Sequence, residues 1–167
     1  MNLFLLRHGI AVEPGTPGYE CDADRPLTPK GERRLAQIAD AMGAMGLTFD
    51  VILSSPYVRA RQTAEIVADA LGLKKNLEFS ASLTPHGDAK VLLAALNKPD
   101  PRSENVLLVG HEPFLSNLIS MLTSGEPHVA IDFKKGGLCK LEIEFLRPGR
   151  CATLAWLLTP RQMELMA

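Results

Sequence analysis

The tripeptide Arg7-His8-Gly9 combines three residue types that together can do chemistry on an anion. Arginine presents a planar fork of donors to an oxyanion, neutral histidine can act as nucleophile or base, and glycine lets the backbone approach a ligand closely. The tripeptide follows the apolar run Leu3–Leu6, which predicts a buried strand. Ligands of open α/β sheets bind at the carboxyl ends of strands. On its own, however, the tripeptide is equally compatible with a solvated arginine and an ordinary histidine.

Two further predicted strand ends carry matching groups. The strand 51–53 runs into Ser54-Ser55-Pro56 and then Arg59, and the strand 105–109 ends in Gly110-His111. Parallel strands deliver their carboxyl ends to one edge of a sheet, so these groups can surround a single pocket. Arg59 falls on the first turn of a helix, where free backbone N–H groups and the helix dipole also favour an anion. Two arginines, two histidines and a helix terminus match a phosphoryl group.

Strands and helices alternate along most of the chain. Helices are expected from Pro29 to about 46, after Pro56 to about 72, over 89–96 and over 113–122, and further strands over 77–83, 129–133, 138–145 and 152–158. The last two strands, joined by the turn 147–150, predict a hairpin. The pattern predicts a three-layer α/β/α sandwich with a mainly parallel central sheet and an antiparallel edge.

Two connecting segments are long. Residues 10–27 form a loop rich in proline, glycine and acidic residues beside Arg7 and His8, and a loop of that length is often functional. The proline-containing segment 97–105 is interpreted as a surface loop and not as a linker, because 167 residues fit one domain. We therefore expect a single domain over residues 1–167.

Composition limits the possible partners. Hydrophobic residues make up 46% and charged residues 22% of the chain, which is typical of a soluble globular protein. The 18 basic and 19 acidic side chains give a net charge of -1, so we expect no nucleic-acid partner and no membrane partner, and any anion site must be local. Three cysteines without a CxxC pair, and no secretory signal pattern, favour a reducing cytoplasm.

Four ordered motifs resemble those of the histidine phosphatases, the phosphoglycerate mutase-like superfamily. They are Arg7-His8-Gly9, the segment PLTPKG at 26–31, the segment SPYVRARQT at 55–63, and Val109-Gly110-His111. The short chain, the segment 83–88 and the absence of a large helical insertion look most like the SixA-type phosphohistidine phosphatases of that superfamily. The resemblance extends from end to end, and it implies the phosphoglycerate mutase-like fold.

The resemblance also implies roles for residues. His8 would attack phosphorus and become phosphorylated, while Arg7, Arg59 and His111 would hold the phosphoryl oxygens beside Gly9. Water would hydrolyse the intermediate in a second step, with no metal or other cofactor. The two guanidinium groups should lower the pKa of His8 and so keep its ring unprotonated.

The proton donor departs from the pattern of the mutases, which place an acidic residue after the strand that precedes the Thr84-Pro85 turn. Glu78 falls too early, Asp88 is typical of a helix N-cap, and His86 is not a carboxylic acid. His86 and Asp88 therefore stay open between turn chemistry and an accessory catalytic role. An imidazole leaves more readily than an alkoxide, which favours phosphohistidine of a partner such as a histidine-phosphotransfer domain.

Other interpretations stay open. The same pocket could serve a phosphomonoesterase or mutase acting on small molecules, although the missing acid counts against that activity. A catalytically silent phosphate-binding module is a third interpretation, since fold and pocket do not prove turnover. Arg61 and the pair Arg33-Arg34 are expected to be solvated helix residues, and His128 is expected in a loop.

Overall fold

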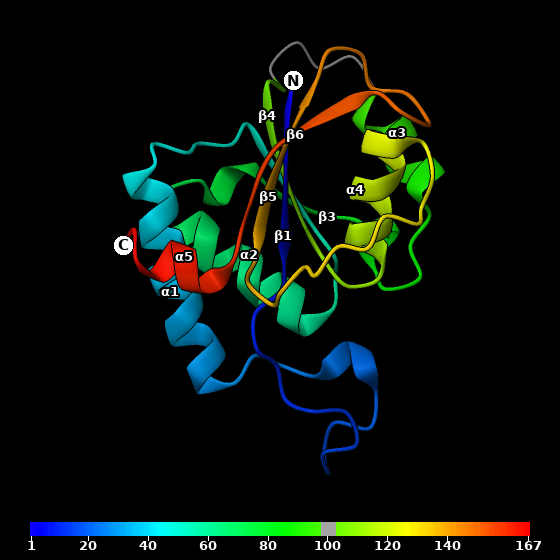
Figure 1. The fold of residues 1–167 in the computed structure, drawn as a ribbon. Coiled ribbons are helices and arrows are strands. Elements are labelled where there is room, and N and C mark those ends of the chain that lie inside the picture. The colour runs from blue at the N-terminus through cyan, green and yellow to red at the C-terminus, as the bar shows by residue number, and fades with distance from the viewer. Residues whose placement is uncertain (98–102) are drawn as a thin grey trace.

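The computed structural model describes residues 1–97 and 103–167, so the centre of the predicted 97–105 loop lies outside the described residues. The described strands form one six-stranded sheet in the order β3-β2-β4-β1-β5-β6 (Figure 1). The strands are β1 (Asn2–Arg7), β2 (Val51–Ser54), β3 (Leu77–Phe79), β4 (Asn105–Gly110), β5 (Leu138–Ile143) and β6 (Ala152–Leu158). The helices are α1 (Pro29–Ala44), α2 (Val58–Ala70), α3 (Ala89–Leu96), α4 (Phe114–Ser124) and α5 (Pro160–Glu164), with short 3-10 turns at Asp22–Asp24, Lys74–Asn76 and Ala81–Leu83.

Strand direction confirms the predicted mainly parallel sheet. Strand β1 pairs parallel with β4, and β2 pairs parallel with both β4 and β3. Strand β5 is antiparallel to β1 and forms the predicted hairpin with β6. The carboxyl ends of β1, β2, β3 and β4 therefore meet at one edge of the sheet, and the amino end of β5 reaches the same edge.

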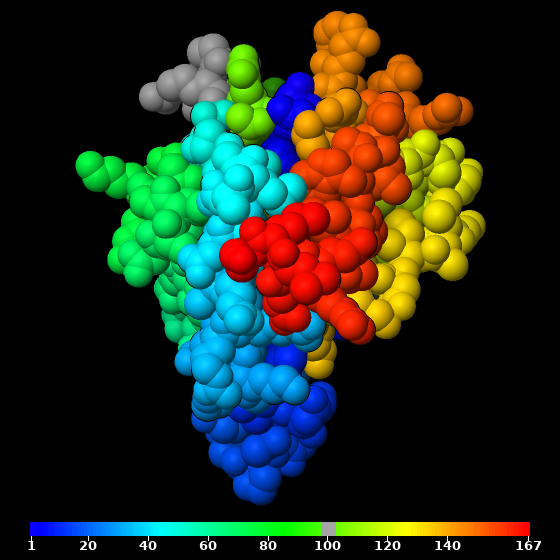
Figure 2. Space-filling model, turned by 60° about the vertical axis from the view of Figure 1, so that its left-hand side comes forward, coloured from blue at the N-terminus to red at the C-terminus, as the bar shows by residue number. Residues whose placement is uncertain are grey.

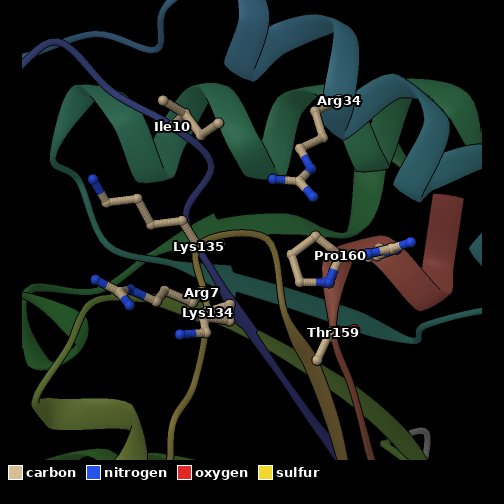
Figure 3. Close-up of a pocket in the computed structure, with 8 residues that line it drawn as sticks. Arg7, Ile10, Arg34, Lys134, Lys135, Thr159 and Pro160 are labelled. Atoms are coloured by element: carbon tan, nitrogen blue, oxygen red, sulfur yellow. The ribbon is translucent and has the colours of Figure 1, made fainter.

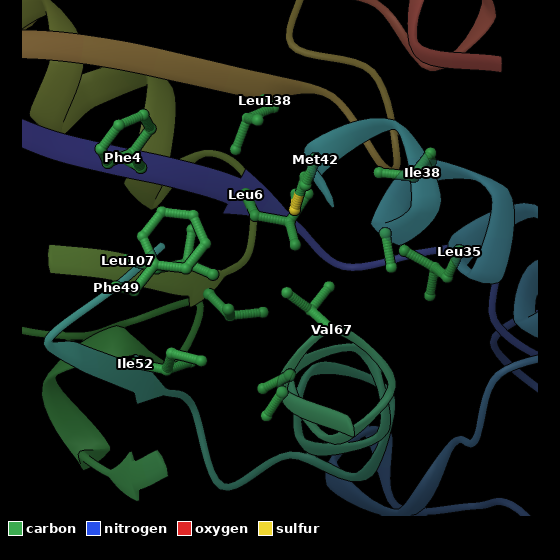
Figure 4. Close-up of a cluster of buried hydrophobic side chains, with 14 of the residues drawn as sticks. Phe4, Leu6, Leu35, Ile38, Met42, Phe49, Ile52, Val67, Leu107 and Leu138 are labelled. Carbon is green, nitrogen blue, oxygen red and sulfur yellow. The ribbon is translucent and has the colours of Figure 1, made fainter. Parts of the chain in front are cut away.

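Helices cover both faces of the sheet, which confirms the three-layer α/β/α sandwich (Figure 1). Side chains alternate along β1, so Phe4 and Leu6 enter one core and Leu3 and Leu5 enter the other. The first core packs β1, β2 and β4 against α1, α2 and α5 (Figure 4). The second packs the opposite face against α3 and α4. This double coverage explains the nearly continuous apolar sequence of the central strands.

Local signals fix the helix ends. The Thr28 hydroxyl accepts a hydrogen bond from the Gly31 N–H at 3.1 Å, with Pro29 in the first turn of α1. Asp88 caps α3 by accepting from the N–H groups of Lys90 and Val91. Gly125 ends α4 in the left-handed region with φ of 93°.

Two predicted strands differ from the structure. The strand expected over 77–83 ends at Phe79, because the Ser80 hydroxyl accepts from the N–H of Ser82 and starts the turn Ala81–Leu83. The strand expected over 129–133 is wrong. Both sides of β5 are already paired with β1 and β6, and the N–H of Val129 donates to the Ser120 hydroxyl of α4 at 2.9 Å instead.

The sequence reasoning missed α5. Thr159 accepts from the N–H of Gln162 and the Gln162 side chain accepts from the N–H of Thr159, which is a complete capping box, with Pro160 in the first turn. Figure 2 shows α5 (red) lying against α1 (cyan), with the loop of residues 10–27 (blue) projecting below. That loop is closed at its base by a bridge between Ala11 and Leu27.

Candidate active site

The ends of the three central strands are tied together by their backbones. Arg7 is opposite Gly110 in the parallel pairing of β1 with β4. One residue further on, the N–H of His8 donates to the Gly110 carbonyl at 3.0 Å, and the N–H of Ser55 donates to the Val109 carbonyl at 2.9 Å. The side chains that leave these strands are therefore held at one place on the sheet edge.

The orientation of His8 fixes its tautomer. The residue is 6% exposed, and its Nδ1 lies 2.7 Å from the Gly9 carbonyl oxygen. A carbonyl only accepts hydrogen bonds, so Nδ1 carries the proton and Nε2 carries the lone pair. The Nε–H of Arg59 points to this Nε2 at 3.3 Å. His8 therefore presents an unprotonated nitrogen beside a cation, as a nucleophilic imidazole must.

Arg59 is held by the long loop. Its Nη1 donates to the Asp22 carbonyl at 2.6 Å, and its Nη2 donates to the Asp22 carboxylate at 2.9 Å. Asp22 also accepts from Arg25, whose guanidinium reaches back to the carbonyl of Val12. The loop of residues 10–27 thus places a carboxylate directly at the cluster.

His111 lies next to His8, with 5.0 Å between the two ring centroids. Its Nε2 is 2.8 Å from the Ser55 hydroxyl, and the Tyr57 ring packs edge-on against it at 5.2 Å. Its Nδ1 is buried and has no hydrogen-bond partner among the residues that the structure describes. The contacts bring together the ends of β2 and β4.

Arg7 is anchored from the side of β5. Its Nη1 donates to the Phe133 carbonyl at 2.7 Å, whereas its buried Nε has no partner within residues 1–97 and 103–167. The backbone of Arg7 is also bonded to the turn before β5, since its N–H donates to Gly137 and its carbonyl accepts from Gly136. The segment that was expected to be a strand thus orients a predicted site residue.

Thr63 links two parts of the cluster that are far apart in sequence. Its buried hydroxyl accepts from the Gly9 N–H at 3.1 Å and donates to the Arg59 carbonyl at 2.7 Å. A Cβ on Gly9 would lie 2.5 Å from Cδ1 of Leu35, so glycine allows α1 to pack against this strand end. The backbone that orients His8 is therefore fixed by α1 and α2 together.

Burial governs the protonation of the two histidines. Burial lowers the pKa of His8 well below 6.5, and the neighbouring His111, Arg59 and Arg7 lower it further. The expected direction is confirmed, although burial outweighs the guanidinium groups as its cause. Burial, assisted by Arg59, also lowers the pKa of His111 to about 3. Both rings are therefore neutral near pH 7.

Asp22 stays ionised at the cluster. Partial burial alone would raise the pKa of its carboxyl, but hydrogen bonds and charge from Arg25 and Arg59 outweigh that effect and lower the pKa below 3.8. The carboxylate in contact with Arg59 therefore holds no proton to donate near pH 7.

The structure gathers Arg7, His8, Arg59 and His111 as the strand-end rule predicted. Asp88 serves as the N-cap of α3, and His86 is exposed and forms no hydrogen bond with a described residue. Arg61 is exposed as expected, while Arg34 is half-buried in an ion pair with Glu164. His128 is exposed in a loop, as expected.

Sequence reasoning missed two contacts of the cluster. The acidic residues of the long loop beside His8 include Asp22, but the position of Asp22 in the sequence does not predict which side chain it contacts. Thr63 lies four residues after Arg59, one helical turn along α2, and that position faces the same side of the helix. Thr63 closes the motif segment 55–63, but neither its residue type nor that of Asp22 assigns it a contact in the cluster.

Within residues 1–97 and 103–167, no three or more His, Cys, Asp or Glu side chains gather as a metal ion would require. No described helix is both long and apolar enough to cross a membrane.

The doubly covered sheet and the cluster at its edge define an α/β protein with groups suited to phosphoryl transfer. Residues 3–83 match the family described as "Histidine phosphatase superfamily (branch 1)". The chain is 32% identical over 127 residues to Phosphohistidine phosphatase SixA of Escherichia coli (strain K12), covering 75% of this chain and 76% of that protein. It is 39% identical over 145 residues to an uncharacterized protein of Picosynechococcus, covering 84% of each chain.

Solved structures agree. The protein histidine phosphatase SixA complexed with tungstate superposes with a TM-score of 0.82 at 27% identity, covering 96% of this chain and 98% of that chain. The putative phosphohistidine phosphatase SixA from Agrobacterium tumefaciens gives a TM-score of 0.76 at 26% identity, covering 95% and 97%. The chain belongs to the histidine phosphatase superfamily and is SixA-like within it.

Proposed function

We propose that this protein is a phosphohistidine phosphatase that hydrolyses phosphohistidine on a partner protein through a phosphorylated His8. The observation that carries the proposal is the 2.7 Å contact between Nδ1 of His8 and the Gly9 carbonyl, which leaves Nε2 unprotonated beside Arg59. The similarity to SixA over about three quarters of both chains supports the same activity. The reaction takes place within one domain over residues 1–167, without a metal.

The first step transfers the phosphoryl group. A bond forms between phosphorus and Nε2 of His8, and the bond from phosphorus to the nitrogen of the substrate imidazole breaks. The substrate ring, protonated beforehand on its other nitrogen, leaves as neutral imidazole. Arg7, Arg59 and His111 surround the position of the transferred group, where donors offset its negative charge.

The second step regenerates His8. Phosphorylated on Nε2 and still protonated on Nδ1, the ring is a cation that the Gly9 carbonyl stabilises by accepting the Nδ1 proton in a hydrogen bond. Water attacks phosphorus, the bond to Nε2 breaks with its electrons returning to the ring, and the proton of the water passes to phosphate or solvent. His8 ends neutral, as it began.

The leaving group decides between protein phosphohistidine and small phosphate esters. An alkoxide needs an acid to protonate it, and the carboxyl group that contacts Arg59 is the ionised Asp22. A protonated imidazole needs no such acid. The geometry therefore suits phosphohistidine, such as that of a histidine-phosphotransfer domain.

A comparison of substrates tests the proposal. We expect kcat/KM to be highest for a phosphohistidine peptide and lower for a sugar phosphate and an aryl phosphate. His8→Ala should lower the rate by at least about 1,000-fold, as removal of a nucleophile does, and should abolish the phosphoenzyme. His128→Ala, which removes an exposed histidine outside the cluster, is the control. Faster hydrolysis of the sugar phosphate would indicate a small-molecule phosphomonoesterase, and no phosphate on His8 from any donor would indicate a binding module.

A further inference from the structure

A cationic hollow adjoins the catalytic cluster. It has a volume of about 600 Å³, and the cations in its lining are Arg7, Arg34, Lys134, Lys135 and Arg161 (Figure 3). These are five of the eight lining residues, and none of the eight carries a negative charge. The chain as a whole has a net charge of -1, so this is a local concentration of cations.

Part of this charge is neutralised by neighbours outside the lining. Arg34 pairs with Glu164, and Lys134 pairs with Asp132 at 2.6 Å. Lys135 and Arg161 form no ion pair with a residue in the described part of the chain. These two side chains therefore leave positive charge available to a ligand.

The hollow is connected to catalysis through Arg7. The turn that carries Lys134 and Lys135 is hydrogen-bonded to the backbone of Arg7 through Gly136 and Gly137, as described above. Gly136 adopts a φ of 81°, and a Cβ there would lie 2.9 Å from Cδ1 of Ile38, so the turn is packed on α1. On the far side of the hollow, Arg161 lies in the capped helix α5. The backbone segments that carry Lys134, Lys135 and Arg161 are therefore held in place.

We propose that this hollow docks an acidic segment of the phosphohistidine-bearing substrate protein, with Lys135 and Arg161 pairing with its carboxylates. The inference rests on the proposed function. Charge complementarity identifies the occupant, because the lining has no acidic residue and its two cations without an ion pair in the described part of the chain, Lys135 and Arg161, favour aspartate and glutamate and repel basic segments. Since Arg7 also lines the hollow, a segment bound there continues directly into the site where phosphorus meets His8.

Two phosphohistidine peptides of equal length test the inference. One carries Asp and Glu on both sides of the phosphohistidine, and the other carries Asn and Gln at the same positions. At low salt we expect the wild type to prefer the acidic peptide by about tenfold in kcat/KM, and high salt should reduce the preference. The double variant Lys135→Glu/Arg161→Glu should lose this preference.

A matched charge reversal controls for net charge. Lys75 and Arg147 are exposed at the opposite end of the sheet, before β3 and after β5. Lys75→Glu/Arg147→Glu should retain the preference for the acidic peptide. Phosphoramidate has no side chains to dock. For each protein, kcat/KM for a peptide is therefore divided by kcat/KM for phosphoramidate before the proteins are compared.

The outcomes separate the two proposals. If the wild type hydrolyses phosphoramidate but neither peptide, the proposed function fails. If it hydrolyses both peptides equally, or if both double variants lose the preference alike, docking in the hollow is overturned while the phosphatase proposal stands. If Lys135→Glu/Arg161→Glu loses activity toward a sugar bisphosphate but keeps the preference for the acidic peptide, the hollow binds a small polyanion and not an acidic segment. A change in sedimentation of Lys135→Glu/Arg161→Glu would assign it to a second copy of the chain.

Discussion

The Asp22 carboxylate lies 2.9 Å from Nη2 of Arg59, the same guanidinium whose Nε points at His8. An anion supplied by the long loop therefore occupies donors that a phosphoryl group also needs. The Asp22 side chain is 51% exposed, so the contact is screened by solvent and can be exchanged at low cost. Substrate binding and the release of Asp22 should be coupled.

Asp22→Asn tests this competition. The amide keeps the size of the side chain but removes its charge, so phosphate should bind Arg59 more tightly. We expect the inhibition constant for inorganic phosphate to fall about two- to fivefold, a change of up to 1 kcal/mol. Steady-state inhibition measures it. A higher inhibition constant would show that Asp22 positions Arg59 and does not compete with phosphate.

The buried histidines predict how stability depends on pH. The pKa of His111 falls from 6.5 to about 3 on folding, so between these values the unfolded state binds a proton that the folded state does not. Stability should therefore be lost as pH falls from about 6.5 toward 3, by at most about 1.4 kcal/mol per pH unit for each such histidine. In urea unfolding, His111→Gln should show a shallower decline than the wild type. Equal slopes would contradict the neutral buried ring.

Thr63 predicts a difference between two conservative variants. Thr63→Val keeps the shape but leaves the Gly9 N–H without its acceptor in a buried place, which should cost about 1–3 kcal/mol. Thr63→Ser retains the hydroxyl and should cost less. Because Gly9 orients His8, kcat should fall more in the valine variant than in the serine variant. Chemical unfolding and single-turnover kinetics measure the two effects, and identical values for both variants would exclude the hydroxyl as the link.

Two glycines of α1 predict opposite effects of the same substitution. A Cβ on Gly31 would lie 2.1 Å from the Ile10 carbonyl oxygen, so Gly31→Ala must displace backbone at the base of the long loop and should destabilise by about 1–3 kcal/mol. On Gly43 the nearest atom is Cδ2 of Leu71 at 3.6 Å, an ordinary contact. Gly43→Ala should stabilise by about 0.5 kcal/mol, because alanine favours the helix. Thermal unfolding compares them, and destabilisation by both would refute the steric argument.

The fold could be predicted where sequence pattern and packing agree. Apolar runs such as Leu3–Leu6 are buried on both faces, helix α1 starts at Pro29 as predicted, and Asp88 caps α3 as predicted. The segment 129–133 has the composition of a strand but no neighbour to pair with, and pairing is not visible in local sequence. Helix α5 is too short to show a repeating apolar pattern in the sequence. It forms because the capping box of Thr159 and Gln162 stabilises its first turn.

The site was predictable in its strand-end residues and less so in its loops. Parallel strands must bring His8 and His111 to one edge, so topology alone places them together. The path of residues 10–27 depends instead on hydrogen bonds from Arg25 and Arg59 to Asp22, which no periodicity encodes. The large effect of burial on the histidine pKa values likewise required the packed structure.

Strand β5 runs opposite to β1, so the chain enters β5 at the edge that carries the cluster and leaves it at the far end. The segment before β5 touches the cluster through Phe133 and the turn at Gly136, yet it belongs to none of the strands that carry His8, Ser55 or His111. Its length and charge can change while those strands keep their pairing. Substitutions confined to this one connection can therefore change the surface beside the cluster without altering the strands that carry His8, Ser55 and His111.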